Sequence, residues 1–110
     1  MKYGNKKTVI DGQKFDSKRE AERYSELLML ERAGHLWGLE RQPRFQIVPT
    51  VKHGGITYKK RFYTADFRYW EGTSHIVEEV KGYKKETAYR LRLQLFLYLY
   101  GNDYEFRETS

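Results

Sequence analysis

The charged strand predicted at residues 76–82, with the sequence IVEEVKG, constrains the fold of this chain more than any other segment. Its β-branched residues favour a strand and Gly82 indicates the end of it, yet two glutamates and a lysine lie within the run. Because side chains alternate along a strand, Glu79 and Lys81 should share one face, and Glu78 should lie on the other. The charged side chains of such a strand form an ion pair, lie on a solvated edge of the sheet, or belong to a functional site. Because they face opposite sides, the two glutamates should not be equivalent.

Hydrophobic periodicity predicts two helices. Residues 17–34 repeat apolar side chains at helical spacing, and Ser17 with Glu20 matches a capping box. Residues 84–100 alternate leucines as a strand does, but several of these leucines also lie on one helical face. The length and the leucine content of this second segment favour a helix.

The remaining segments predict strands. A type I′ hairpin is predicted at residues 11–12, and strands are predicted at residues 44–51, 55–70, 76–81 and 103–109. The order helix, three strands, helix, strand (α-β-β-β-α-β) predicts an α/β fold in which helices flank a mixed central sheet. Since the chain has 110 residues and no linker-like or repeated segment, residues 1–110 are predicted to form a single domain.

Composition narrows the class of protein. The absence of cysteine excludes disulfides and thiolate metal sites. No apolar run approaches the roughly 18 residues of a membrane span, and the first residues lack the apolar stretch of a signal peptide, so we expect a cytoplasmic protein without membrane contact. A net charge of +6 with ten Tyr, six Phe and two Trp suggests nucleic acid as a partner, because cations neutralise phosphates and aromatic rings stack on bases.

Asp66 is an unusual residue for the middle of the predicted strand at residues 55–70. If this strand forms a hairpin with residues 76–81, Asp66 should lie close to Glu79 and Lys81. Two carboxylates and a lysine at a sheet end would suit a divalent cation such as Mg²⁺, which prefers oxygen ligands. A cross-strand ion pair between Asp66 and Lys81 on a solvated face explains the same residues, and the pattern alone leaves both interpretations open.

The same residues carry a family resemblance. Asp66, followed after twelve residues by Glu79-Val80-Lys81, resembles the D…(D/E)xK signature of the PD-(D/E)XK, or restriction-endonuclease-like, nucleases, although Ala65 or Thr64 stands where the signature has proline. Residues 15–24 (FDSKREAERY) resemble the first helix of the branch that contains small phage nucleases and junction-resolving enzymes, and residues 39–47 (LERQPRFQI) resemble the start of its first core strand. From about residue 8 to 106 the chain resembles a family of short phage and prophage proteins of uncharacterised function.

The resemblance implies a restriction-endonuclease-like core and a Mg²⁺-dependent DNA endonuclease, with Mn²⁺ as a substitute metal, acting on phage DNA or recombination intermediates in a bacterial host cell. Asp66, Glu79 and the backbone carbonyl of Val80 would hold the metal. Lys81 would orient the attacking water or stabilise the developing charge. Glu20 would complete the metal site, but helix capping alone also explains this glutamate.

Further residues are predicted to contact DNA. The cluster Lys84, Lys85, Arg90 and Arg92 would bind phosphates, although a solvated basic face is an equal interpretation. Gln94 and Tyr98 resemble a Q-x-x-x-Y motif of the RecB-like branch, and helix packing is the alternative for this pair. We expect a homodimer without a small-molecule cofactor. The alternative function is a DNA-binding accessory protein that has the same fold and no catalytic activity.

Overall fold

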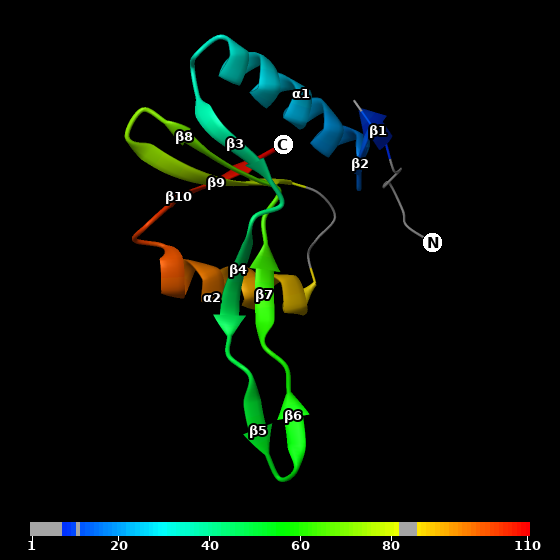
Figure 1. Ribbon diagram of the computed structural model, residues 1–110, viewed down its shortest axis with the longest axis vertical. Coiled ribbons are helices and arrows are strands. Elements are labelled where there is room, and N and C mark those ends of the chain that lie inside the picture. Colours follow the sequence, from blue (N-terminus) through cyan, green and yellow to red (C-terminus); the bar gives the residue numbers. More distant parts are fainter. Residues whose placement is uncertain (1–7, 11, 82–85) are drawn as a thin grey trace.

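The structure is a computed structural model that describes residues 8–10, 12–81 and 86–110. Its central sheet has four strands in the order β10-β9-β8-β3 (Figure 1). Their bounds are Trp37–Arg41 for β3, Phe67–Glu71 for β8, Ser74–Val80 for β9 and Glu105–Thr109 for β10. β9 pairs parallel with β10 and antiparallel with β8, and β8 pairs antiparallel with β3. The sheet is mixed, as predicted, and the charged strand β9 lies inside it, so the solvated-edge interpretation is wrong.

Two helices flank the sheet, as the periodicity predicts. α1 spans Lys18–Arg32, and the Ser17 hydroxyl accepts the backbone N–H of Glu20 at 3.1 Å. α2 spans Thr87–Tyr100, so the leucine-rich segment is helical. In Figure 1, α1 lies on one side of the sheet and α2 on the other.

The sheet separates two hydrophobic clusters, one under each helix. The cluster on the α1 side contains Phe15, Ala21, Tyr24, Leu27, Leu36, Phe67, Tyr69, Ile76 and Val80. The cluster on the α2 side contains Phe45, Ile47, Tyr63, Ala65, Val77, Tyr89 and Phe96. β9 contributes to both clusters, because alternate residues of a strand face opposite sides of its sheet. Its charged residues are therefore placed between two apolar layers.

A long two-stranded ribbon leaves the body between β3 and β8. It consists of β4 (Arg44–Val48) paired with β7 (Arg61–Thr64), continued by β5 (Val51–His53) paired with β6 (Ile56–Tyr58). The ribbon crosses α2 at its base and projects beyond the body (Figure 1), within an overall extent of 54 × 39 × 24 Å. The predicted strands at residues 44–51 and 55–70 are therefore each divided, and the first strand of the central sheet is β3, which the periodicity did not predict.

The chain bends at Ala65 and Asp66, between β7 and β8, where the prediction had one unbroken strand. The backbone N–H of Ala65 donates to the carbonyl of Pro43 at 3.1 Å, whereas the N–H of Asp66 donates to the carbonyl of Glu78 at 3.2 Å. Two neighbouring residues thus hydrogen-bond to different strands, because the ribbon ends and the central sheet begins at this point. With the ribbon and the N-terminal hairpin set aside, the element order α1-β3-β8-β9-α2-β10 has the predicted α-β-β-β-α-β pattern, but its first strand is β3 instead of the predicted strand at residues 44–51.

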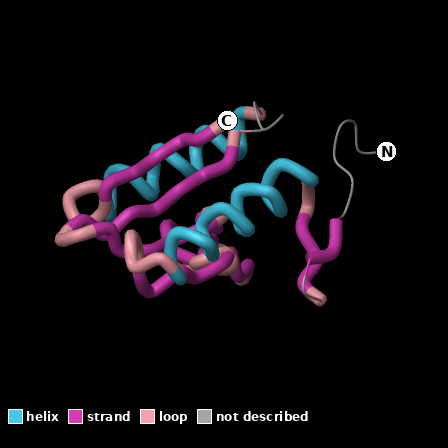
Figure 2. The backbone as a smooth tube through the Cα atoms, turned by 90° about the horizontal axis from the view of Figure 1, so that it is seen from above, coloured by secondary structure: helices cyan, strands magenta, loops and turns pink. Residues whose placement is uncertain are grey.

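The predicted hairpin near the N-terminus is formed by β1 (Thr8–Ile10) and β2 (Gln13–Phe15), which pair antiparallel. Figure 2 shows this hairpin beyond the N-terminal end of α1. Its last residue, Phe15, is buried and lies 5.2 Å from the ring of Tyr24 on α1, which attaches the hairpin to the core. Among the described helices, none is long and apolar enough to cross a membrane.

Candidate functional site

Asp66 lies at the bend before β8, and its side chain is buried against the end of β9. Its Oδ2 accepts the backbone N–H of Val80 at 2.7 Å. Val80 lies between Glu79 and Lys81, so this hydrogen bond brings the Asp66 carboxylate to the segment that carries the other residues of the signature. The bend, rather than strand alternation, sets the direction of the Asp66 side chain.

Glu79 is buried on the α2 side of β9, with 2% of its surface exposed. The hydroxyl of Tyr63 donates to its Oε1 at 2.6 Å. Burial, followed by the charge of Glu79, raises the pKa of Tyr63 above its ordinary value of 10, so this hydroxyl keeps its proton and remains a donor. The same two causes, burial first, raise the pKa of Tyr89 to about 12. Two protonated tyrosines therefore lie close to this carboxylate.

Glu78 faces the α1 side and is fully buried in a hydrogen-bonded network. Arg23 of α1 donates to both of its carboxylate oxygens, from Nε at 2.6 Å and from Nη2 at 3.0 Å. The hydroxyls of Tyr69 and Thr109 donate at 2.5 and 3.0 Å. Burial alone would raise the pKa of Glu78, but the hydrogen bonds from Arg23 and Tyr69 outweigh it and lower this pKa below its ordinary value. The two adjacent glutamates thus face opposite sides of the sheet, as predicted.

Lys81 is the first residue after β9, and its side chain is exposed. Its backbone N–H donates to the carbonyl of Thr109 at 2.5 Å, which extends the pairing of β9 with β10 by one residue. The lysine thus lies at the same end of β9 as Asp66 and Glu79, and it faces solvent where both carboxylates are buried.

Glu20 lies in the first turn of α1 and is buried, with Nη2 of Arg41 at 3.8 Å from its Oε2. α1 covers the Glu78 side of β9, whereas Glu79 belongs to the α2 side. Within residues 8–10, 12–81 and 86–110, no three Asp, Glu or His side chains form a group that could hold a metal ion. Glu20, Asp66 and Glu79 do not form such a group among the described residues, and the role of Glu20 in a metal site stays a prediction.

The predicted DNA-binding residues fall on different faces of α2. Lys84 and Lys85 lie outside the described residues. Arg92 is half-buried on the inner face, whereas Arg90 and Gln94 are exposed and Tyr98 is 83% exposed. Each residue of a helix turns the chain by about 100°, so residues two positions apart lie on nearly opposite sides. Arg92 therefore faces away from both Arg90 and Gln94. The Q-x-x-x-Y pair faces solvent, so the packing interpretation of this pair is wrong.

A cavity of about 240 Å³ opens between β7 and the start of α2. Tyr63 lines it and connects it to the Glu79 carboxylate through the hydrogen bond described above. The other lining residues are Phe62, Thr64, Glu86, Tyr89 and Arg92. Arg92 is thus the one predicted DNA contact among the described residues of α2 that reaches this cavity, and Glu86 adds a negative charge to its wall.

Several residues of this region were absent from the sequence prediction. In one unbroken strand over residues 55–70, Tyr63 would lie on the face opposite Asp66. The available signal was the aspartate itself, since aspartate is disfavoured within strands. Glu108 pairs in register with Glu79 across β9 and β10, and Arg23 binds Glu78 from a distant position in the chain. No local pattern marks either of these two contacts.

Comparison with known proteins gives one match. The family model described as "Protein of unknown function (DUF1064)" matches residues 1–107, and the chain belongs to this family. The match covers nearly the whole chain and agrees with the predicted relationship to a family of uncharacterised function. No curated protein and no solved structure matches the chain.

Proposed function

We propose that the chain is a metal-dependent DNA endonuclease with a restriction-endonuclease-like core. The observation that carries this proposal is the hydrogen bond from the Val80 N–H to Asp66, which places a buried carboxylate beside Glu79 and Lys81 at the end of the central strand β9. The spacing of these residues in the sequence resembles the nuclease signature, and the contact between Asp66 and Val80 supports the proposal. The element order of the core supports the same proposal.

The residues at this end of β9 fit Mg²⁺ by their chemistry. Asp66 and Glu79 provide carboxylate oxygens, and the Val80 carbonyl is a further hard oxygen donor. Mg²⁺ commonly uses one or two carboxylates and fills its other positions with water and substrate phosphate. A third protein carboxylate such as Glu20 is therefore not required. Bound there, Mg²⁺ or Mn²⁺ would act as a Lewis acid and lower the pKa of a bound water.

The neighbouring groups position these two carboxylates. The Val80 N–H orients Asp66, and the Tyr63 hydroxyl orients Glu79, each through one carboxylate oxygen. The Tyr63 hydroxyl keeps its proton at neutral pH, so it remains a donor that fixes the orientation of the Glu79 carboxylate. The exposed ammonium of Lys81 would stabilise the negative charge that develops on the phosphate during hydrolysis.

Cleavage assays with isosteric variants test this proposal. Wild-type protein is expected to cut linear, nicked, flapped or four-way-junction DNA in the presence of Mg²⁺ or Mn²⁺. Asp66→Asn and Glu79→Gln should abolish cleavage, since each amide oxygen can still accept the observed hydrogen bond but brings no charge to the metal. Lys81→Ala should lower the cleavage rate by roughly 100- to 1,000-fold while metal binding survives, because the lysine is no ligand.

Glu22→Gln is the matched control for these variants. Glu22 is an exposed glutamate of α1 that lies 3.8 Å from Arg19, so the substitution removes the same charge from the solvent-facing side of this helix. The control should cut DNA as the wild type does. Equal loss of activity in Glu22→Gln and Glu79→Gln, or a wild type that cuts none of the four DNA structures with either metal, contradicts the nuclease proposal.

A DNA-binding accessory protein without catalysis is the second candidate function. The burial of Glu79, with 2% of its surface exposed and its Oε1 bonded to Tyr63, is the observation that favours it. A carboxylate so enclosed can serve to hold β7 against β9. Calorimetric titration with Mn²⁺ separates the two functions: binding that is lost in Asp66→Asn supports the nuclease, and DNA binding without any metal binding supports the accessory protein.

A further inference from the structure

The ribbon beyond Val48 and Arg61 has the dimensions of a nucleic-acid-binding arm. Every residue from 49 to 61 is exposed, and among the described elements no helix or other strand packs on β5 and β6. At about 3.3 Å per residue, its six residues on each strand extend roughly 20 Å from the body. The major groove of B-DNA is about 12 Å wide and admits a two-stranded ribbon. The arm is therefore long and narrow enough to enter a groove.

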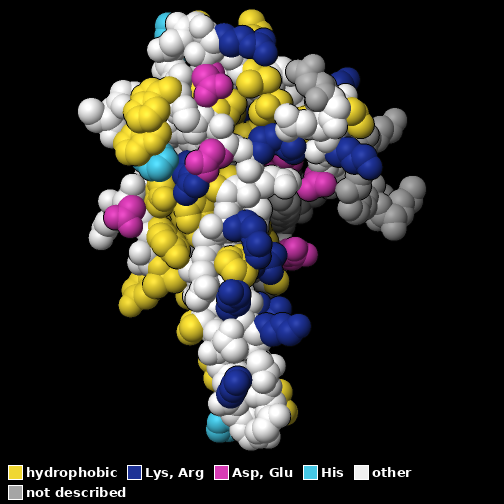
Figure 3. Space-filling model, in the orientation of Figure 1, with side chains coloured by type: hydrophobic (Ala, Val, Ile, Leu, Met, Phe, Trp, Pro, Cys, Tyr) yellow, Lys and Arg dark blue, Asp and Glu magenta, His cyan; other side chains and the backbone are white. Residues whose placement is uncertain are grey.

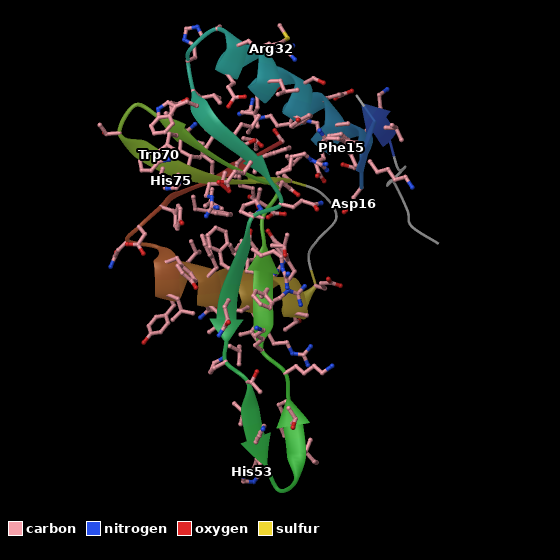
Figure 4. All side chains as sticks on the ribbon, viewed as in Figure 1. Phe15, Asp16, Arg32, His53, Trp70 and His75 are labelled. Atoms are coloured by element: carbon pink, nitrogen blue, oxygen red, sulfur yellow. The ribbon has the colours of Figure 1, made fainter. Side chains whose placement is uncertain are left out.

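The tip of the arm has a fixed turn. Gly54 and Gly55 both have positive φ angles, of 59° and 79°, which a two-residue type I′ turn requires at its two central positions. The turn sets the register Lys52↔Thr57 and His53↔Ile56. Figure 4 shows His53 at this end of the molecule, far from the central sheet. The arm is thus a regular twisted hairpin whose side chains have defined faces.

Charge is concentrated on this ribbon. Residues 44–61 contain five Lys or Arg and no Asp or Glu, in a chain whose net charge is +6. The five cations are Arg44, Lys52, Lys59, Lys60 and Arg61. In Figure 3, dark-blue side chains follow the ribbon from its base toward the tip, and its projecting part carries no acidic side chain. Because no acidic residue of the ribbon neutralises these cations, this part of the molecule attracts polyanions.

The cations continue from the arm to the candidate active site. The guanidinium carbon of Arg44 lies 4.0 Å from the centre of the Phe62 ring, and Nζ of Lys60 lies 5.8 Å from it. Phe62 also lines the cavity that Tyr63 and Arg92 share. A phosphate backbone that runs along the base of the arm would thus reach this cavity.

We infer that the projecting hairpin is an arm that inserts into a groove of duplex DNA and holds it against the end of β9. Lys52, Lys59 and Lys60 bind phosphates, and the exposed Val51, Ile56 and Tyr58, which lie on the face opposite Lys52, contact sugars and thymine methyl groups. The inference rests on the proposed function in one respect, since the duplex is also the molecule that Asp66 and Glu79 would cut. Binding without metal tests the arm independently of cleavage.

Equilibrium binding in EDTA measures the arm directly. The probe is a fluorescently labelled duplex of 30 base pairs, titrated with the full chain at several salt concentrations. The triple variant Lys52→Ala/Lys59→Ala/Lys60→Ala is expected to bind more weakly and to reduce the slope of log K against log salt by up to about three units, since each phosphate contact contributes roughly 0.9. All three side chains are exposed, so the body should stay folded.

A charge-matched triple variant is the control. Lys14→Ala/Lys18→Ala/Arg32→Ala removes three exposed cations from β2 and α1, far from the arm. Its salt slope should remain near that of the wild type. Equal loss of slope in the two triple variants would show that only net charge attracts DNA, and this result would overturn the inference.

The absence of cysteine permits a second, position-specific measurement. An iron–EDTA group attached at Thr57→Cys should cut bound duplex, whereas the same group at Met29→Cys, an exposed position of α1, should not. No cutting from position 57 would overturn the inference.

The apolar face of the arm could instead bind a second copy of the chain, so Val51→Ser/Ile56→Ser is examined by sedimentation. A dimer that dissociates in this variant without any loss of DNA affinity would likewise overturn it.

Discussion

At the residue scale, the two adjacent glutamates of β9 perform different tasks. Glu78 is held by a guanidinium and two hydroxyls on the α1 side, and it joins α1, β8, β9 and β10. Glu79 has a tyrosine donor on the α2 side and lies beside the residue that binds Asp66. The first arrangement neutralises a buried charge, whereas the second orients a carboxylate at the end of β9 where Asp66 is bound. Strand alternation is the physical reason for the division.

The loss of Glu78 should therefore be a loss of stability. Glu78→Ala leaves the Arg23 guanidinium without its main partner, and removal of one member of a buried ion pair costs about 3 to 5 kcal/mol. The complete burial of the Glu78 side chain is the reason for so large a loss. Urea denaturation measures the change in the free energy of unfolding. A loss below about 1 kcal/mol would contradict the role given to this network.

The same carboxylate sets a pH dependence. Its pKa is lower in the folded protein than its ordinary value of 4.5, so the unfolded chain binds the proton more readily. The stability that Glu78 contributes is complete above about pH 4.5 and is lost as the pH falls through the lower pKa of the folded state. The wild type should lose stability over this acidic range more steeply than Glu78→Ala does.

At the element scale, the sequence predicts the helices and the charged strand better than the ribbon. Helical spacing and the Ser17 cap identify α1 because both are local properties. β9 is identified by its β-branched residues for the same reason. The division of residues 55–70 into β6, β7 and β8 depends on which distant strand each part meets. At the bend, the N–H groups of Ala65 and Asp66 find partners in Pro43 and Glu78, and no local pattern contains this information.

Local sequence patterns also predict only a part of the candidate site. The contact between Asp66 and the segment 79–81 follows from a short hairpin between neighbouring strands, so spacing predicts it. The separation of Glu20 from Glu79 depends on which side of the sheet α1 covers. From the sequence alone, α1 could pack on either side of the sheet. The side that it covers depends on how the apolar clusters pack in the folded protein.

The packing of α2 against the base of the ribbon gives a prediction for this element. Phe96 is fully buried, with ring centroids 4.7 Å from Phe45 and 5.0 Å from Tyr63. Phe96→Ala should lower the free energy of unfolding by about 3 to 5 kcal/mol, because it leaves a cavity between α2, β4 and β7. Leu91→Ala, on the exposed side of the same helix, should change it by less than about 0.5 kcal/mol. Thermal and urea unfolding of both variants provide the measurement.

At the scale of the whole molecule, the two ends of the central sheet differ in character. Trp70 stacks on Trp37 at 5.3 Å and on His75 at 3.9 Å, at the turn between β8 and β9 (Figure 4). The opposite end of β9 carries the carboxylates and Lys81 and adjoins the basic ribbon. The charged residues of the candidate site thus lie at one end of the sheet, and stacked aromatic side chains lie at the other.

This arrangement predicts that DNA binding and DNA cleavage can be removed separately. Glu79→Gln should bind duplex as tightly as the wild type or more tightly, because it removes a negative charge near the proposed DNA path, and it should not cut. The triple lysine variant of the arm should bind weakly, yet at saturating DNA it should cut at nearly the wild-type rate, since the arm contributes to KM rather than to kcat. Single-turnover cleavage with Mg²⁺, measured beside binding in EDTA, compares the two variants. If the arm variant loses kcat as completely as Glu79→Gln does, the arm belongs to the catalytic machinery, and the division of the molecule into a binding ribbon and a cleaving sheet end is wrong.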